Sequence, residues 1–107
     1  VYPVQTRTAS QKVMAVHYSV PASRDLHDHA EFLCDADPFA AERWLESHDA
    51  TCALLGKHPK MGEVIAIRGH GECRRFVSGN YVILYREASD GIEILRILRG
   101  GREIDRI

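Results

Sequence analysis

The sequence predicts an α+β fold in which an N-terminal strand and an antiparallel helical hairpin precede a three- to four-stranded antiparallel meander. Two observations carry this prediction. Apolar residues recur at helical spacing between residues 26 and 55, and after residue 63 they form short β-rich runs separated by turn residues. The 107 residues are enough for one domain with a single modest core.

The N-terminal segment is expected to contribute little to this fold. Residues 1–13 are polar, lack acidic side chains and show no period. We expect a disordered lead-in or an expression remnant there, and a single domain over residues 14–107. Residues 16–20 alternate between apolar and polar side chains, which is typical of a short strand, and Pro21 is expected to end it.

Capping signals place the two helices. Ser23 is a suitable N-cap for a first helix, with Asp25 in the acidic first turn. Asp37-Pro38 then offers an N-cap acceptor followed by proline at the first position of a second helix. Gly56 is expected to stop that helix. Because the linker is only a few residues long, the helices should form an antiparallel hairpin.

Turn residues divide the last third of the chain into strands. Ser78-Gly79-Asn80 and Asp90-Gly91 separate three β-rich runs. Residues 81–85 are apolar on both faces, so they predict a central strand that is covered on both sides. The helical hairpin can cover one side, and the other needs the chain's own tail or a partner. We expect a fully antiparallel sheet and a core that includes Leu26, Leu33, Trp44, Leu45, Cys52, Ile83 and Leu95.

Composition narrows the class of protein. Hydrophobic residues make up 45% and charged residues 27% of the chain, as in ordinary soluble domains. There is no apolar stretch of membrane-spanning length and no start that resembles a signal peptide, so we expect a cytoplasmic protein with three reduced cysteines. The formal net charge of −1 disfavours bulk nucleic-acid binding, and we expect no direct sequence-specific contact with nucleic acid.

A metal site is not expected. His27 and His29 flank Asp28, but positions i and i+2 of a helix do not face each other, so the two rings cannot chelate as a pair. The other histidines show no ligand spacing, and no nucleotide-binding or hydrolase motif is present. We therefore expect neither a metal nor a cofactor.

Arginines are the remaining candidates for a site. After residue 61 the chain has eight arginines and no lysine, and guanidinium suits paired contacts to carboxylate or phosphate. One interpretation is that they are solvated strand-face residues. The other is that four of them converge on one sheet face and hold an RNA phosphate: Arg74, Arg86, Arg96 and Arg99. Cleavage of RNA also needs acid and base groups, and the tail after Leu98 has neither histidine nor tyrosine.

The last strands carry the most specific pattern in the chain. Pro59-x-Met61-Gly62 precedes Arg74-x-Phe76, which is followed by Tyr81-Val-Ile-x-Tyr-Arg. Gly91-Ile-Glu-Ile-x-Arg-Ile-Leu and a basic, glycine-containing tail complete the set. In this order and at these spacings, the motifs resemble the ParE/RelE superfamily of small bacterial toxins over residues 16–107.

The resemblance implies one of two branches. RelE-like toxins cleave mRNA on the ribosome, and here the catalytic candidates would be Arg74, Arg86 and Arg96. ParE-like toxins lack the acid/base set and poison DNA gyrase. The tail looks more like the ParE branch, although Arg99 stands where histidine is usual and Glu103 where aspartate is usual.

The leading hypothesis from the resemblance is a ParE-like toxin that binds and inhibits gyrase and is not an enzyme. A cognate ParD-like antitoxin would hold it inactive in a hetero-oligomer. Contacts to the target are expected at Arg99, Arg102 and Ile104, and the antitoxin-binding residues are unknown. A RelE-type mRNA endonuclease is the alternative, and a non-toxic protein-binding module of the same fold is the second alternative.

Overall fold

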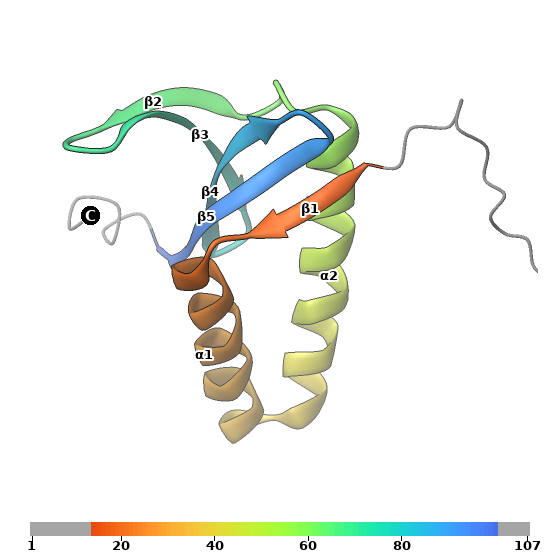
Figure 1. Cartoon of the computed structure of the whole chain (residues 1–107). Helices are drawn as coiled ribbons and strands as arrows, with labels where there is room; N and C mark the ends of the chain where they lie inside the picture. Colours follow the sequence, from red (N-terminus) through yellow and green to blue (C-terminus); the bar gives the residue numbers. More distant parts are fainter. Residues whose placement is uncertain (1–13, 101–107) are drawn as a thin grey trace, which may run out of the picture.

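A computed structural model of the chain describes residues 14–100 (Figure 1). The element order is strand, two helices and four strands, which confirms the predicted α+β class. The predictions for residues 1–13 and for the tail after Gly100 lie outside the described residues. The elements are β1 (Ala15–Tyr18), α1 (Val20–Ala36), α2 (Pro38–Lys57), β2 (Glu63–Ile67), β3 (Gly71–Ser78), β4 (Tyr81–Ala88) and β5 (Gly91–Arg99).

The five strands form one sheet in the order β1-β5-β4-β3-β2. β2 to β5 make the predicted antiparallel meander. The prediction of a fully antiparallel sheet is wrong at β1, which pairs parallel to β5 with Ala15 opposite Gly91. The reason is that the helical hairpin intervenes between β1 and the meander, so β1 joins the sheet beside the last strand and not beside the next one.

The first helix begins earlier than predicted. Ser19 is its N-cap, and the Ser19 hydroxyl accepts a hydrogen bond from the Ala22 N–H at 3.1 Å. Pro21 lies inside the first turn, where its missing N–H has no intrahelical partner to lose. The assignment of Ser23 as cap is therefore wrong: proline opens α1 and does not merely end β1.

The second helix begins as predicted. Asp37 is the N-cap of α2, and its carboxylate accepts from the Phe39 N–H at 3.0 Å. The helix runs one residue past Gly56, because Gly56 is buried against β1 and adopts helical geometry. Figure 1 shows the two helices as an antiparallel hairpin on one face of the sheet.

The sheet separates two apolar clusters. The cluster under the helices contains Tyr81, Ile83 and Tyr85 of β4, and a second cluster on the other face contains Val82 and Leu84. All of residues 81–85 are buried, as predicted. Of the predicted core, Cys52 and Ile83 are buried, Leu26 and Trp44 are half-buried against the first cluster, and Leu33 and Leu45 are half-buried.

Leu95 is placed differently from the prediction. It packs against the second cluster, on the face away from the helices. The register between β4 and β5 shifts at this point, since Leu84 pairs with Arg96 and Tyr85 pairs with Ile94. Leu95 is thus the extra residue of a β-bulge, and simple alternation along β5 does not predict where it points.

Candidate functional site

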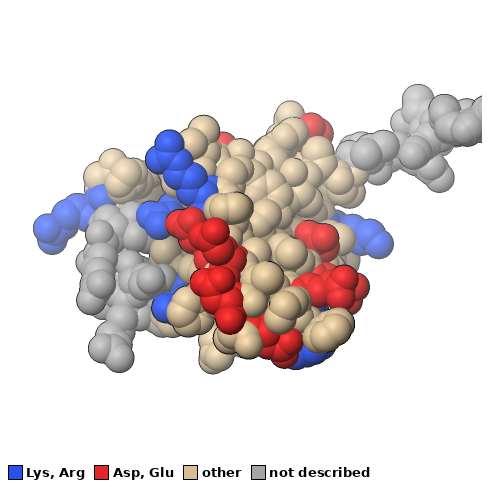
Figure 2. Space-filling view, turned by 90° about the horizontal axis from the view of Figure 1, so that it is seen from below, with Lys and Arg blue, Asp and Glu red and all other residues tan. Residues whose placement is uncertain are grey.

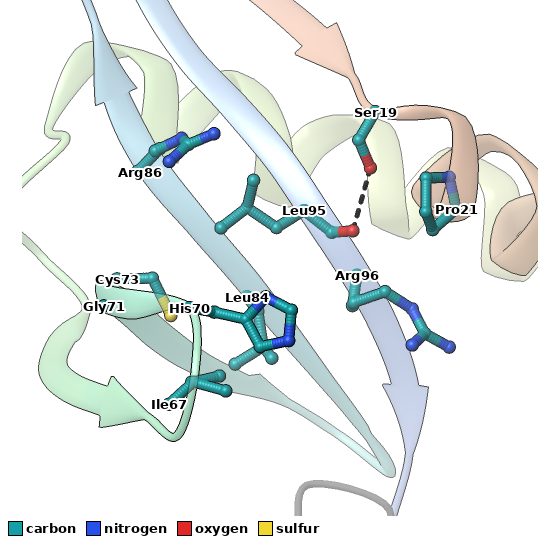
Figure 3. A pocket seen from close by; sticks show the side chains of 10 residues that line it. All are labelled: Ser19, Pro21, Ile67, His70, Gly71, Cys73, Leu84, Arg86, Leu95 and Arg96. Carbon is teal, nitrogen blue, oxygen red and sulfur yellow. Dashed lines mark hydrogen bonds between the residues drawn. The ribbon is translucent and has the colours of Figure 1, made fainter. Parts of the chain in front are cut away.

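The sheet face opposite the helices holds a mostly apolar pocket with charged groups at its rim. We call it the open-face pocket (Figure 3); its volume is about 440 Å³. Such a volume suits a small ligand or the side chains of a bound peptide. Its walls are mostly apolar, and Ser19 closes one side by donating a hydrogen bond to the Leu95 carbonyl oxygen at 2.9 Å. The lining residues are Ser19, Pro21, Ile67, His70, Gly71, Cys73, Leu84, Arg86, Leu95 and Arg96.

Both arginines at this rim are engaged by carboxylates of the same chain. Arg86 donates to Glu93 at 3.0 Å. Arg96 donates to both oxygens of Asp25, at 2.7 and 3.1 Å, and the same carboxylate accepts from the Ile97 N–H at 2.9 Å. Asp25 thereby ties α1 to β5, so the rim carries paired charges.

Arg74 holds the entry to β2. Its guanidinium donates to the Gly62 carbonyl oxygen at 2.7 Å and lies 3.7 Å from the Glu87 carboxylate. The hydroxyl of Tyr85 accepts from the Gly62 N–H at 2.8 Å and donates to the Pro59 carbonyl oxygen at 2.8 Å. Hydrogen bonds thus join the sequence motif at Gly62 to Arg74 of β3 and Tyr85 of β4 in one structural unit.

The four arginines converge only in part. Arg86 lines the open-face pocket together with Arg96, and it lines a smaller neighbouring hollow of about 190 Å³ together with Arg74. Arg99 departs from this group: its guanidinium lies over the ring of Phe32 in α1, 4.2 Å from the centroid. Arg102 and Ile104 lie outside the described residues.

A buried polar cluster between β1 and α2 was not predicted. The hydroxyl of Tyr18 and Nε2 of His48 are hydrogen-bonded at 2.9 Å, and the Cys52 thiol lies 3.4 Å from the same nitrogen. Burial lowers the pKa of His48 and raises that of Cys52 to about 11, so both groups are neutral near pH 7. The only sequence signal was the i, i+4 spacing of His48 and Cys52 on the apolar stripe of α2.

The histidine pair considered for metal binding is split by the helix. His29 points toward the sheet, where its Nε2 donates to the Ile97 carbonyl oxygen at 2.7 Å, whereas His27 is exposed. Within residues 14–100, no three histidine, cysteine or acidic side chains lie together as a metal-binding group.

Charge is distributed unevenly over the surface. Figure 2 shows acidic side chains gathered on the face that is seen from below, where the helical hairpin lies, with basic side chains toward the sides. Seven acidic residues belong to α1 and α2 against three basic ones. Neither of these helices is both long and apolar enough to cross a membrane.

Similarity to known proteins agrees with this architecture. A family model described as the ParE toxin of type II toxin-antitoxin system, parDE, matches residues 16–104. A solved chain of the chromosomal ParDE toxin-antitoxin system from P. aeruginosa has the same fold, with a TM-score of 0.66 at 18% sequence identity. That likeness covers 84% of this chain and 99% of the other. A search of curated proteins found no match.

Proposed function

Since the chain belongs to the ParE toxin family of type II toxin-antitoxin systems, we propose that it inhibits DNA gyrase by binding and is not itself an enzyme. A ParD-like antitoxin neutralises it within a hetero-oligomer. A cytoplasmic location is part of this proposal, because DNA gyrase acts there. Inhibition by binding, and not by catalysis, is supported chiefly by the pairing of the candidate arginines with other groups of the same chain.

The arginines that an endonuclease would use are engaged by other groups of the same chain. Arg96 is held by two bonds to Asp25, and Arg86 is paired with Glu93. Arg74 is bound to the Gly62 carbonyl and lies near Glu87. A guanidinium that faces a carboxylate presents less net positive charge to a phosphate than an unpaired one. This observation favours a protein-binding toxin over an RNA-cleaving one.

The open-face pocket is the proposed contact for the antitoxin. The helices cover only the other side of the sheet, and β4 is apolar on both faces. An extended apolar segment of the antitoxin would fill the pocket and be ordered on binding. Coupled folding of this kind gives a large negative heat-capacity change, which titration calorimetry at several temperatures measures.

The proposed target contacts are Arg99, Arg102 and Ile104. The test is induced expression in bacteria together with gyrase supercoiling in vitro. We expect filamentation, DNA-damage signalling and loss of supercoiling with the full chain. A chain that ends at Leu98 lacks all three residues and should lose toxicity, while antitoxin binding largely survives. Lost antitoxin binding with toxicity intact would instead move the target contact to another surface.

The RelE-type endonuclease is the second candidate, because Arg86 shares hollows with both Arg74 and Arg96. It predicts translation arrest and mRNA cleavage in purified ribosomes, abolished by Arg74→Ala. Such cleavage would refute the gyrase proposal. Absence of any growth phenotype would favour the third candidate, a non-toxic binding module.

A further inference from the structure

The lining of the open-face pocket contains basic groups and, within the described residues, no carboxylate. Arg86, Arg96 and His70 line the pocket, and no acidic side chain does. The carboxylates that pair with the two arginines, Glu93 and Asp25, are not part of the lining. The interior of the pocket therefore favours an anionic group over a cationic one.

Arg86 keeps part of its guanidinium available for a partner. Its Nε donates to Glu93 at 3.0 Å, and within residues 14–100 neither Nη1 nor Nη2 makes a hydrogen bond. The Arg86 side chain is 55% exposed. A guanidinium is a planar fork, and the edge formed by its two Nη groups can receive both oxygens of a carboxylate. Arg86 can thus bind a second carboxylate while it remains hydrogen-bonded to Glu93.

The rest of the lining selects a partner that is mainly apolar. Leu84 of β4 is buried, and Ile67 of β2 and Leu95 of β5 pack against its cluster. Figure 3 shows Arg86 and Arg96 on opposite sides of Leu95, so the charged groups flank an apolar floor. A small free anion would contact the rim and leave most of the pocket, about 440 Å³, unfilled. A protein segment with an apolar side chain next to an acidic one can contact both the floor and the rim.

We infer that Arg86 binds an acidic residue of the antitoxin and thereby positions an adjacent apolar side chain in the open-face pocket. The inference rests on the proposed function and adds to it the chemistry of the antitoxin segment. Glu93 lies opposite Arg86 on the neighbouring strand and lowers the net positive charge that Arg86 presents. Arg86 therefore raises the affinity for an acidic segment, and Glu93 lowers it.

The experiment substitutes both members of this pair in the full chain and measures the affinity for the purified antitoxin encoded beside the toxin. Arg86→Gln removes the positive charge and keeps a polar side chain. Glu93→Gln removes the negative charge and keeps an oxygen that can accept from Arg86. Arg75→Gln is the matched control. Arg75 pairs with Glu63 and lies opposite Leu84 on the same sheet face, but it does not line the pocket.

We expect Arg86→Gln to weaken antitoxin binding about tenfold and Glu93→Gln to strengthen it about threefold. Arg75→Gln should bind like the wild type. Because the charge of Arg86 also attracts the antitoxin over a distance, the affinity of Arg86→Gln should fall less steeply with added salt. Weakened binding in both Arg86→Gln and Glu93→Gln would overturn the inference, because a pair that only supports the fold is broken by either substitution.

A charge reversal distinguishes direct contact from an effect on the fold. Arg86→Glu should weaken binding further than Arg86→Gln, with thermal unfolding of the toxin still cooperative. Lysine in place of one acidic residue of the antitoxin should restore binding to Arg86→Glu. If no such lysine restores it, the inference is overturned.

Leu95→Ala shows which proposal fails. Loss of binding in Leu95→Ala with wild-type affinity in Arg86→Gln overturns the inference and leaves the open-face pocket as the antitoxin contact. Wild-type affinity in both variants overturns the pocket as well. Binding of single-stranded RNA that depends on Arg86, with antitoxin binding independent of it, overturns the inference in favour of an RNA phosphate. Gyrase inhibition is measured separately with the unsubstituted toxin, so its failure does not alter these outcomes.

Discussion

The hydroxyl of Tyr85 connects the loop that follows α2 to the centre of the sheet. This hydroxyl accepts from the Gly62 N–H and donates to the Pro59 carbonyl oxygen, both at 2.8 Å. The substitution Tyr85→Phe removes only the hydroxyl. Burial raises the pKa of Tyr85, so the hydroxyl remains a neutral donor over the whole range of stability measurements.

The cost of this substitution follows from the groups it leaves behind. Gly62 is buried, so its N–H cannot be satisfied by bulk water once the hydroxyl is gone. An unsatisfied buried donor costs about 1–3 kcal/mol, so we expect Tyr85→Phe to lower the free energy of unfolding by about 2 kcal/mol. For a domain of this size, that corresponds to a Tm about 8 °C lower.

Tyr81→Phe is the matched control on the same strand. Tyr81 is also buried under the helices, and its hydroxyl has no hydrogen bond within the described residues. Urea denaturation followed by fluorescence reports both variants, because Trp44 is the only tryptophan and stacks on His48 in the core. Equal losses of stability in the two variants would refute the role assigned to the Tyr85 hydroxyl.

Three further predictions concern other parts of the fold. Gly91→Ala should detach β1 and lower the Tm, since a β-carbon there would overlap the Ala15 carbonyl oxygen; amide exchange in β1 would measure the loss, and native protection would contradict it. Burial lowers the pKa of His48 in the folded state. Below about pH 6.5 the unfolded chain therefore binds more protons than the folded chain, and the free energy of unfolding decreases as the pH is lowered. The Tm at pH 5.5 should therefore lie below that at pH 7.5, and His48→Gln should reduce the difference. Addition of zinc or of a chelator should leave the Tm unchanged, and a shift of several degrees would revive a metal site at His27 or His29.

The sequence predicts elements where one local signal has one structural outcome. Asp37-Pro38 begins a helix because the carboxylate caps and proline fits the first turn, and the structure confirms it. Pro21 is compatible with two structures, the end of a strand and the first turn of a helix. The choice depended on Ser19, whose capping role appears only when its hydroxyl reaches the Ala22 N–H.

Long-range geometry accounts for the remaining differences. The bulge that turns Leu95 away from the helices is a property of the β4–β5 register and not of either strand alone. The stacking of Arg99 on Phe32 joins two residues that are 67 positions apart, and no spacing rule connects them. The resemblance to ParE toxins was found from the motifs, whereas the structure was needed to show that Arg74 supports the loop at Gly62.

The parallel pairing of β1 with β5 has a consequence for how the toxin is made. The partner of Ala15 is Gly91, so β1 cannot enter the sheet until β5 has been synthesised. Contacts between such distant residues form late and slow the folding of a domain. A chain that lacks β5 cannot place β1 in the sheet. The sheet of the toxin is therefore complete only after β5 has been synthesised.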